Sequence, residues 1–348
     1  MTEKGRRPSL MAQARKSPLA GLVSLASVGT LLLAAGFLIV GVACSDSSEN
    51  ASLPTQREGN SSGDVGTDGQ QAPATLATQG SQNSGSVVLA GAGDIADCES
   101  SADEATAALL DDIAGTVFTA GDNAYPDGTP SEFADCYNPT WGRHKSRTRP
   151  SPGNHDYHTD GAAGYFDYFA AAAGARGEGY YSYELGAWHV VVLNSNCEDL
   201  ACDGGSVQEE WLRADLEASS AKCTLAYWHH PRFSSGSHGN DDSVSAFWEL
   251  LYQYDADVVV NGHDHDYERF APQDPNGESD SERGIREFVV GTGGKSLREF
   301  EDIQPNSEVR NSDTFGVIRL TLYPESYDWE FIPAEGDFTD SGSGEACH

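Results

Sequence analysis

The feature that most constrains this chain is a series of short apolar strands, each followed by a turn that carries acidic, amide or imidazole side chains. Val258–Val260 is the clearest case, because three β-branched residues in a row predict a buried strand. His263 and His265 follow in the next turn, and histidines at this spacing can hold one metal ion or two. Such a pair alone is more typical of an ordinary loop, so the other turns decide its meaning.

Four further strands end in turns of the same kind. Val87–Ala92 leads to Gly93-Asp94, Val117–Ala120 to Gly121-Asp122-Asn123-Ala124-Tyr125, Pro150–Pro152 to Gly153-Asn154-His155-Asp156, and Leu225–Trp228 to His229-His230-Pro231. Glycine lets the backbone turn sharply before the acidic and amide side chains. In an open α/β sheet such turns lie at the carboxyl ends of the strands, so their side chains should converge on one crevice. Together the five turns predict a metal site that no single turn would.

Helix and strand patterns alternate through the first half of the chain and strands dominate its end. Capping boxes at Ser101 and Ser206 each predict the start of an amphipathic helix. This alternation is typical of an α/β fold with paired sheets. We expect one folded domain over residues 87–335 and a Gly/Ser-rich tail over residues 336–348.

The N-terminal residues 1–43 are predicted to be an export segment, because a basic stretch precedes the uncharged apolar run Leu19–Ala43. Cys44 stands where a bacterial lipoprotein is lipidated, and the alternative is an uncleaved signal anchor. In both cases the domain is expected outside the cytoplasm, either anchored to the cell membrane or secreted. Residues 44–86 are rich in Ser, Gly, Gln, Asn and Thr and are expected to form a disordered linker.

The net charge limits which partners the protein can bind, and the cysteine content indicates whether the chain forms disulfides outside the cytoplasm. The formal net charge of −33 argues against a nucleic-acid polymer as partner. Six cysteines remain after Cys44, and an even number in an exported chain predicts disulfides. Of the fifteen possible pairings, the most economical joins Cys98–Cys136, Cys197–Cys202 and Cys223–Cys347.

The order of the five turns resembles the calcineurin-like metallophosphoesterases, and within them the purple acid phosphatase branch. Many of these enzymes have a histidine where Ala96 stands, whereas Tyr125 follows Asp122 at the spacing of that branch. A tyrosine phenolate suits a hard Fe(III) ion. The resemblance extends over roughly Val87–Pro333 and implies a four-layer α/β/β/α sandwich with a single catalytic domain.

The resemblance also implies a site for two metal ions, an Fe(III) and a divalent Zn, Mn or Fe. It assigns Asp94, Tyr125 and His265 to the Fe(III), Asn154, His229 and His263 to the divalent ion, and Asp122 to both. It further implies that His155 faces the phosphate, that Asp156 orients His155, and that His238 helps to protonate the leaving oxygen. The family often has a second histidine after this last one, but Gly239 stands there.

The implied activity is that of an exported phosphatase, in which a metal-bridging hydroxide attacks a small phosphate monoester. Two alternatives stay open: a phosphodiesterase or nucleotidase on the same fold, and a non-catalytic module that retains metals for stability. His230 is expected to hydrogen-bond to nearby backbone. The glycine-rich run Gly291–Ser296 is expected to be a turn near the mouth of the site and not a P-loop, because Val289 stands where that motif requires glycine.

Overall fold

The computed structural model of this protein describes residues 85–348. The predicted export segment, Cys44 and nearly all of the predicted linker lie outside the described residues. Among residues 85–348, no helix has both the length and the apolar character needed to cross a membrane.

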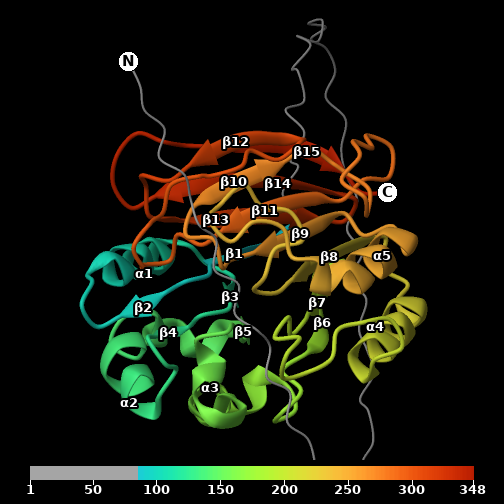
Figure 1. Ribbon diagram of the computed structural model, residues 1–348. Coiled ribbons are helices and arrows are strands. Elements are labelled where there is room, and N and C mark those ends of the chain that lie inside the picture. Colours follow the sequence, from blue (N-terminus) through green and yellow to red (C-terminus); the bar gives the residue numbers. More distant parts are fainter. Residues whose placement is uncertain (1–84) are drawn as a thin grey trace, which may run out of the picture. The chain divides into compact units, whose positions relative to one another are not determined.

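Two mixed β-sheets form the centre of the fold (Figure 1). The first contains β1 (Val87–Ala92), β3 (Thr116–Ala120), β5 (Thr148–Ser151), β13 (Gly316–Tyr323), β14 (Ser326–Pro333) and β15 (Ser341–Ala346), in the order β15-β14-β13-β1-β3-β5. The second contains β6 (Tyr181–Leu185), β7 (Trp188–Val192), β8 (Cys223–Tyr227), β9 (Val258–Asn261), β10 (Tyr267–Phe270), β11 (Arg286–Val290) and β12 (Ser307–Asn311), in the order β12-β10-β11-β9-β8-β7-β6. The short strands β2 (Ala96–Asp97) and β4 (Ala124–Tyr125) pair separately.

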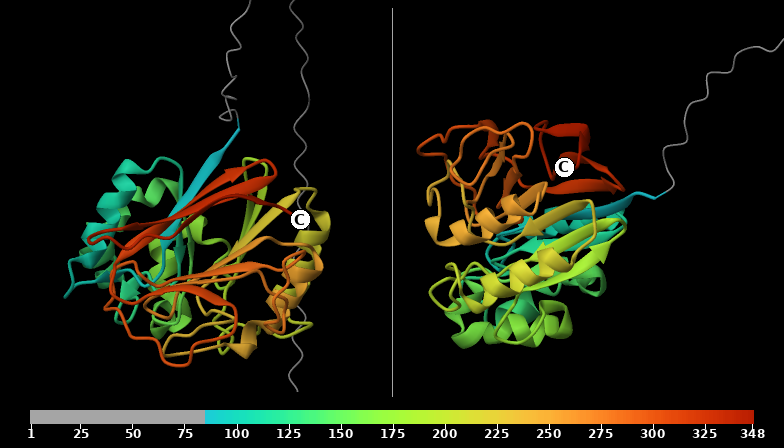
Figure 2. Two further views of the ribbon diagram at one scale, coloured as in Figure 1. Left: turned by 90° about the horizontal axis from the view of Figure 1, so that it is seen from above. Right: turned by 90° about the vertical axis from the view of Figure 1, so that its right-hand side faces the viewer.

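Helices cover the outer faces of both sheets. The helices α1 (Ala102–Asp112), α2 (Pro130–Glu132) and α3 (Ala163–Phe169) lie beside the first sheet, and α4 (Val207–Ala218) and α5 (Ser245–Gln253) beside the second. In the left view of Figure 2, the blue-green α1 and the yellow α5 lie on opposite sides of the two packed sheets. The predicted α/β/β/α sandwich is therefore confirmed.

The second sheet has an apolar core on each face, which explains why its strands read as continuous apolar runs. In β9, Val258 and Val260 pack in the core that also contains first-sheet residues such as Leu89. Val259 points the other way and packs with residues of α4 and α5. Successive side chains of a strand alternate between its faces, so a strand buried on both faces has no polar positions. Full burial of each such valine contributes about 1.5–3 kcal/mol.

The turns that carry the candidate ligands are joined to one another by backbone hydrogen bonds. Asp94 N–H donates to the carbonyl of Gly121 (3.2 Å), and Ile95 N–H donates to the carbonyl of Asp122 (3.0 Å). Gly93 connects the two sheets, since its N–H donates to the carbonyl of Val290 (2.9 Å). These bonds join the carboxyl ends of β1, β3 and β11, and the Gly262 N–H donates to the carbonyl of His229 (3.0 Å), which joins the turns after β8 and β9.

The three predicted disulfides are present: Cys98–Cys136, Cys197–Cys202 and Cys223–Cys347. The C-terminal residues differ from the prediction, because Ser341–Ala346 is not a separate tail but strand β15, paired antiparallel with β14. Its Gly/Ser-rich sequence has no apolar alternation, and backbone pairing together with the neighbouring Cys347 disulfide holds it in the sheet. The folded domain thus continues to the end of the described residues.

Candidate metal centre

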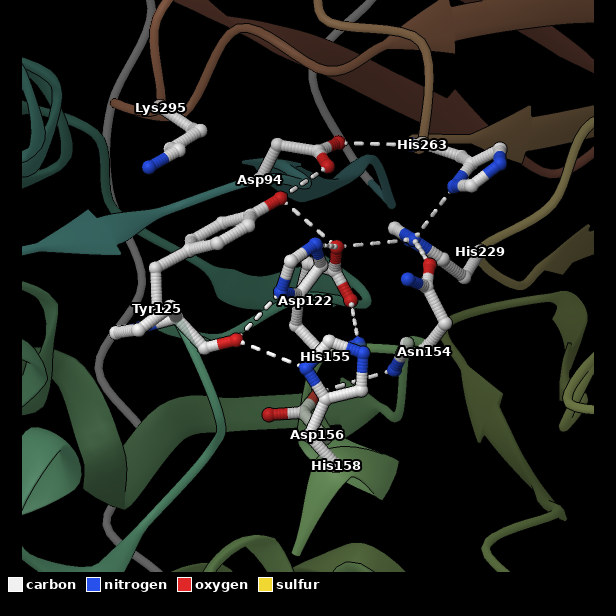
Figure 3. A network of polar contacts seen from close by, with 12 residues as sticks. Asp94, Asp122, Tyr125, Asn154, His155, Asp156, His158, His229, His263 and Lys295 are labelled. Carbon is white, nitrogen blue, oxygen red and sulfur yellow. Dashed lines mark hydrogen bonds and ion pairs between the residues drawn. The ribbon is translucent and has the colours of Figure 1, made fainter. Parts of the chain in front are cut away.

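The structure brings all the predicted ligands together at the edge where the five strands end. Figure 3 labels all of them except His265. Asp94 follows β1, Asp122 follows β3, Tyr125 lies in β4, Asn154 follows β5, His229 follows β8, and His263 and His265 follow β9. Both Asp94 and Asp122 are buried. The donor atoms form two connected groups.

The first group is centred on the Tyr125 hydroxyl. Its oxygen lies 2.8 Å from Asp94 Oδ1, 2.8 Å from Asp122 Oδ2 and 3.3 Å from His265 Nε2. His265 Nε2 in turn lies 3.3 Å from Asp94 Oδ1. These are the residues that the family resemblance assigns to Fe(III), together with the aspartate that it assigns to both ions.

The second group is centred on His229 Nε2. This nitrogen lies 3.0 Å from Asn154 Oδ1, 3.2 Å from His263 Nδ1 and 3.3 Å from Asp122 Oδ2. The same oxygen of Asp122 therefore borders both groups, which is the geometry of a shared carboxylate. His229 also forms a potential metal-binding cluster with Asp94 and Asp122.

The hydrogen bonds around these donors leave more lone pairs than protons at the centre. Nδ1 of His229 lies 2.8 Å from the carbonyl of Ala120, and Nδ1 of His265 lies 2.8 Å from the carbonyl of Ser296. A nitrogen that faces a carbonyl carries the proton, so both Nε2 atoms direct lone pairs inward. Tyr125 has a single proton to share between two carboxylates. This arrangement, in which each histidine is oriented by a carbonyl behind it, fits bound cations.

The electrostatic balance of the site also favours cations. Burial and the charges of Asp122 and Asp94 raise the pKa of Tyr125 well above its usual value, so a phenolate there requires a positive counter-charge. Burial alone would lower the pKa of His229, but Asp122 outweighs it and raises that pKa to about 9, so a proton takes the Nε2 lone pair at neutral pH unless a metal ion replaces it. Burial and the neighbouring His229 lower the pKa of His263 well below its usual value, which keeps this ring neutral and able to ligate.

Three candidate ligands have left-handed backbone conformations, which are uncommon for residues other than glycine. The φ angles are 59° at Asp94, 49° at Asp122 and 71° at His263. Each such residue costs about 1–3 kcal/mol of strain and persists only where the surrounding structure holds it. Three of them at one site indicate that the positions of these side chains are fixed at the expense of local backbone stability.

His155 lies beside this cluster, but its orientation has a different cause from the predicted one. Its Nδ1 lies 2.6 Å from the carbonyl of Pro126, and its Nε2 lies 3.9 Å from Asp122 Oδ2. Asp156 Oδ2 instead accepts hydrogen bonds from Asn123 Nδ2 (2.9 Å) and from the Gly153 N–H (2.9 Å). The prediction that Asp156 orients the His155 ring is therefore wrong, because the carboxylate turns back into the loop and holds its backbone. Burial and Asp122 raise the pKa of Asp156 to about 7.

Two further histidines border the second group. His238 Nδ1 lies 2.9 Å from Asp264 Oδ1, and its ring centre lies 4.1 Å from that of His263. His230 Nδ1 lies 2.8 Å from the hydroxyl of Ser195. The His230 ring was predicted to hydrogen-bond to backbone, but its partner is this side chain. Burial and the charge of His229 lower the pKa of His230 to about 4. Its ring centre lies 4.4 Å from that of His263.

The glycine-rich turn after β11 supplies two basic residues that sequence reasoning did not assign to the site. Lys295 Nζ lies 4.8 Å from the centre of the Tyr125 ring and 2.6 Å from Asp97 Oδ2. Arg298 Nη1 lies 2.9 Å from His238 Nε2. The only sequence feature that pointed to these two residues was the run Gly291–Ser296, because a turn directly after a strand is expected at the edge where the candidate ligands lie.

A cavity of about 450 Å³ opens next to the second group of donors. Asn154 and His230 form its inner wall. Its outer wall consists of polar and acidic residues, including His158, Asp199 and Asp241. The cavity is large enough for the organic part of a small phosphate ester.

Comparison with known proteins identifies the family. The family profile described as calcineurin-like phosphoesterase matches residues 69–267, which is more than half of the chain. The chain belongs to the calcineurin-like phosphoesterase family.

Its similarity to the purple acid phosphatases within this family confirms the predicted resemblance. Purple acid phosphatase 21 of Arabidopsis thaliana is 32% identical over 218 residues, which cover 55% of this chain and 48% of that protein. Purple acid phosphatase 18 of the same plant is 31% identical over 159 residues, which cover 43% of this chain and 35% of that protein. This calcineurin-like phosphoesterase thus spans less than half of the length of both relatives.

Solved structures show the same fold. The purple acid phosphatase PPD1 from yellow lupin (Lupinus luteus) seeds has a TM-score of 0.60 at 19% identity, covering 74% of this chain and 54% of that one. GAP50, the anchor in the inner membrane complex of Plasmodium, has a TM-score of 0.59 at 12% identity, covering 76% of this chain and 90% of that one. At these identities the likeness establishes the fold alone, and function depends on the residues of the site.

Proposed function

We propose that this protein is an exported dinuclear-metal phosphatase that hydrolyses small phosphate monoesters. The observation that carries the proposal is the position of Asp122 Oδ2, which borders both the Tyr125 hydroxyl (2.8 Å) and His229 Nε2 (3.3 Å). Asp94, Tyr125 and His265 would hold an Fe(III) on one side of this oxygen. Asn154, His229 and His263 would hold a divalent Zn, Mn or Fe on the other.

The protein's own residues would orient the substrate around these ions. When bound, two adjacent metal ions supply positive charge to the phosphate oxygens and lower the pKa of a water between them. The carbonyl of Pro126 fixes the His155 ring by its Nδ1, which leaves Nε2 directed toward the cluster as a hydrogen-bonding group for the phosphate. Asp264 holds His238 by Nδ1 at the opposite side, where the leaving group would depart. Asp156 acts indirectly, because its carboxylate holds the backbone of the turn that carries Asn154 and His155.

The compartment and substrate class are part of the same proposal. Three disulfides are typical of an oxidising compartment outside the cytoplasm. Residues 1–43 would direct export, with either lipidation at Cys44 or a signal anchor as the membrane tether, and residues 44–86 would act as a linker. The catalytic domain would start near residue 87. A formal net charge of −33 disfavours polyanionic partners such as nucleic acids.

Two other functions use the same fold. A phosphodiesterase or nucleotidase would need the same metal pair, and the walls of the cavity would decide between mono- and diesters. A non-catalytic role deserves a test because GAP50, a protein of this fold, is described as an anchor. His155 and His238 favour catalysis, because a purely structural metal site does not require histidines beyond its ligands.

Metal analysis combined with a substrate panel tests the proposal. The purified protein is expected to hold two transition-metal ions per chain and to cleave an aryl phosphate monoester faster than the matching diester. A visible tyrosinate-to-iron absorption should disappear in Tyr125→Phe. Protein with two bound metals but no hydrolysis of either ester would establish the non-catalytic alternative. A colourless, active two-zinc enzyme would refute the assignment of Fe(III).

A further inference from the structure

Arg298 lies at the rim of the candidate site and reaches from one metal group to the other. Its backbone N–H donates to the carbonyl of His265 (3.0 Å), a candidate Fe(III) ligand. Its side chain crosses to the turn after β8, where Nη1 lies 2.9 Å from His238 Nε2. His238 in turn stacks on His263 with ring centres 4.1 Å apart. The guanidinium is therefore separated from a candidate divalent-metal ligand by one imidazole ring.

The hydrogen bonds determine which groups donate at this rim. A guanidinium can only donate, so His238 Nε2 accepts from Arg298. The other ring nitrogen, Nδ1, lies 2.9 Å from Asp264 Oδ1 and carries the ring proton. In this arrangement neutral His238 offers no N–H to a bound group, and it could protonate a leaving oxygen only once Arg298 has left Nε2 and that nitrogen has taken up a proton. Arg298, by contrast, has N–H donors left over.

Arg298 also differs from most arginines of this protein in its charge partner. Arg143, Arg269 and Arg286 each pair with two carboxylates. Arg298 contacts His238 and, within residues 85–348, forms no ion pair with a carboxylate. The chain has 54 acidic side chains against 21 Lys and Arg, yet no carboxylate among the described residues compensates this guanidinium beside the site. It is half-buried, which reduces the screening of its charge by water.

We propose that Arg298 binds an oxygen of the phosphate group at the metal pair, on the side of the site where His238 lies. This inference rests on the proposed function and adds a residue to it. The planar fork of N–H donors suits a phosphate oxygen, and its positive charge does not depend on pH in the working range.

Phosphate binding to the metal-loaded protein tests the role of Arg298. In Arg298→Gln the amide can still donate to His238 while the charge is lost, and Arg298→Lys keeps the charge without the fork. Calorimetric titration with inorganic phosphate should show a Kd about tenfold weaker for Arg298→Gln, equivalent to about 1.4 kcal/mol, and a smaller loss for Arg298→Lys. The control is Arg310→Ala, since Arg310 is another arginine without a carboxylate ion pair and its guanidinium hydrogen-bonds to Ser307. It should bind phosphate like the wild type.

Ester hydrolysis supplies a second readout. Arg298→Gln should raise KM for an aryl phosphate more than it lowers kcat, with two metals per chain retained. Unchanged Kd and KM in Arg298→Gln would overturn the inference and leave the proposed function intact. Wild-type protein that binds phosphate but hydrolyses no ester would overturn the proposed function, and the Kd comparison would still decide the role of Arg298.

Discussion

Replacement of Gly153 by alanine should damage the metal centre although Gly153 is not itself a candidate ligand. A Cβ at this position would lie less than 3.0 Å from both Oδ1 and the backbone N of Asp122. Asp122 has little freedom to move, because its Oδ1 accepts the His155 N–H (2.8 Å) and its carbonyl accepts the Ile95 N–H (3.0 Å). The new methyl group must therefore displace either the shared carboxylate or the turn that carries Asn154.

The expected cost follows from similar overpacking in protein cores. Inserting a methyl group into a tightly packed position destabilises a protein by about 1–3 kcal/mol. In a domain of this size each kcal/mol lowers Tm by about 2–4 °C. Metal affinity should fall by about 10–100-fold, as it does when residues that orient a ligand are changed.

Chelator-stripped protein and metal-loaded protein should be measured separately, by thermal unfolding and by metal titration. Gly204→Ala is the matched control, because a Cβ there meets nothing within 4 Å. It should leave both quantities close to the wild type. If Gly153→Ala binds metal with wild-type affinity, the close approach of this glycine to Asp122 does not position the shared carboxylate, and the reasoning is refuted.

Three further predictions concern stability. Replacing Cys223 and Cys347 with serine opens a loop with a sequence separation of 124 and should lower the free energy of unfolding by about 5 kcal/mol in the chain-entropy treatment. The same change at Cys197 and Cys202, separated by 5, should lower it by about 2 kcal/mol. Equal losses for the two variants in denaturant unfolding would contradict this. Burial raises the pKa of Asp257 from 3.8 to about 7, so the folded state holds this proton more tightly and stability falls as pH rises from about 4 to 7. Asp257→Asn should remove about 2–3 kcal/mol of the stability difference between pH 5 and pH 8, an effect that the exposed control Asp313→Asn should lack. Chelation of bound metals should lower Tm, because a metal ion at a free concentration of about 100 times its Kd stabilises the folded state by about 2.7 kcal/mol. An unchanged Tm would argue that the buried donors hold no metal.

Much of the site could be predicted because the strands that carry it are short, apolar and buried. Val258–Val260 and Thr116–Ala120 each identify a strand, and the turn that follows is then placed at an edge by the geometry of parallel sheets. The identity of the first residues after each strand was therefore enough to predict which side chains meet.

Contacts that depend on side-chain direction or on distant segments could not be predicted in this way. Asp156 is adjacent to His155, yet its carboxylate contacts Gly153 and Asn123, because the direction of each side chain depends on the local turn. Arg298 is 60 residues from His238, and no pattern in the sequence links the two. Strand β15 is held by backbone pairing and by the ion pair of Glu345 with Arg286 (3.3 Å), and its Gly- and Ser-rich sequence has no apolar pattern to recognise.

The division of the donors between the two sheets has a consequence for how the site is assembled. Asp94 and Asn154 follow strands of the first sheet, and Tyr125 lies in β4, which comes directly after the first-sheet strand β3. His229, His263 and His265 follow strands of the second sheet. Each proposed metal ion would take donors from both sheets, so neither sheet alone could coordinate it fully. Full coordination would then require the two sheets to be docked, so the appearance of metal binding during refolding would report that docking step.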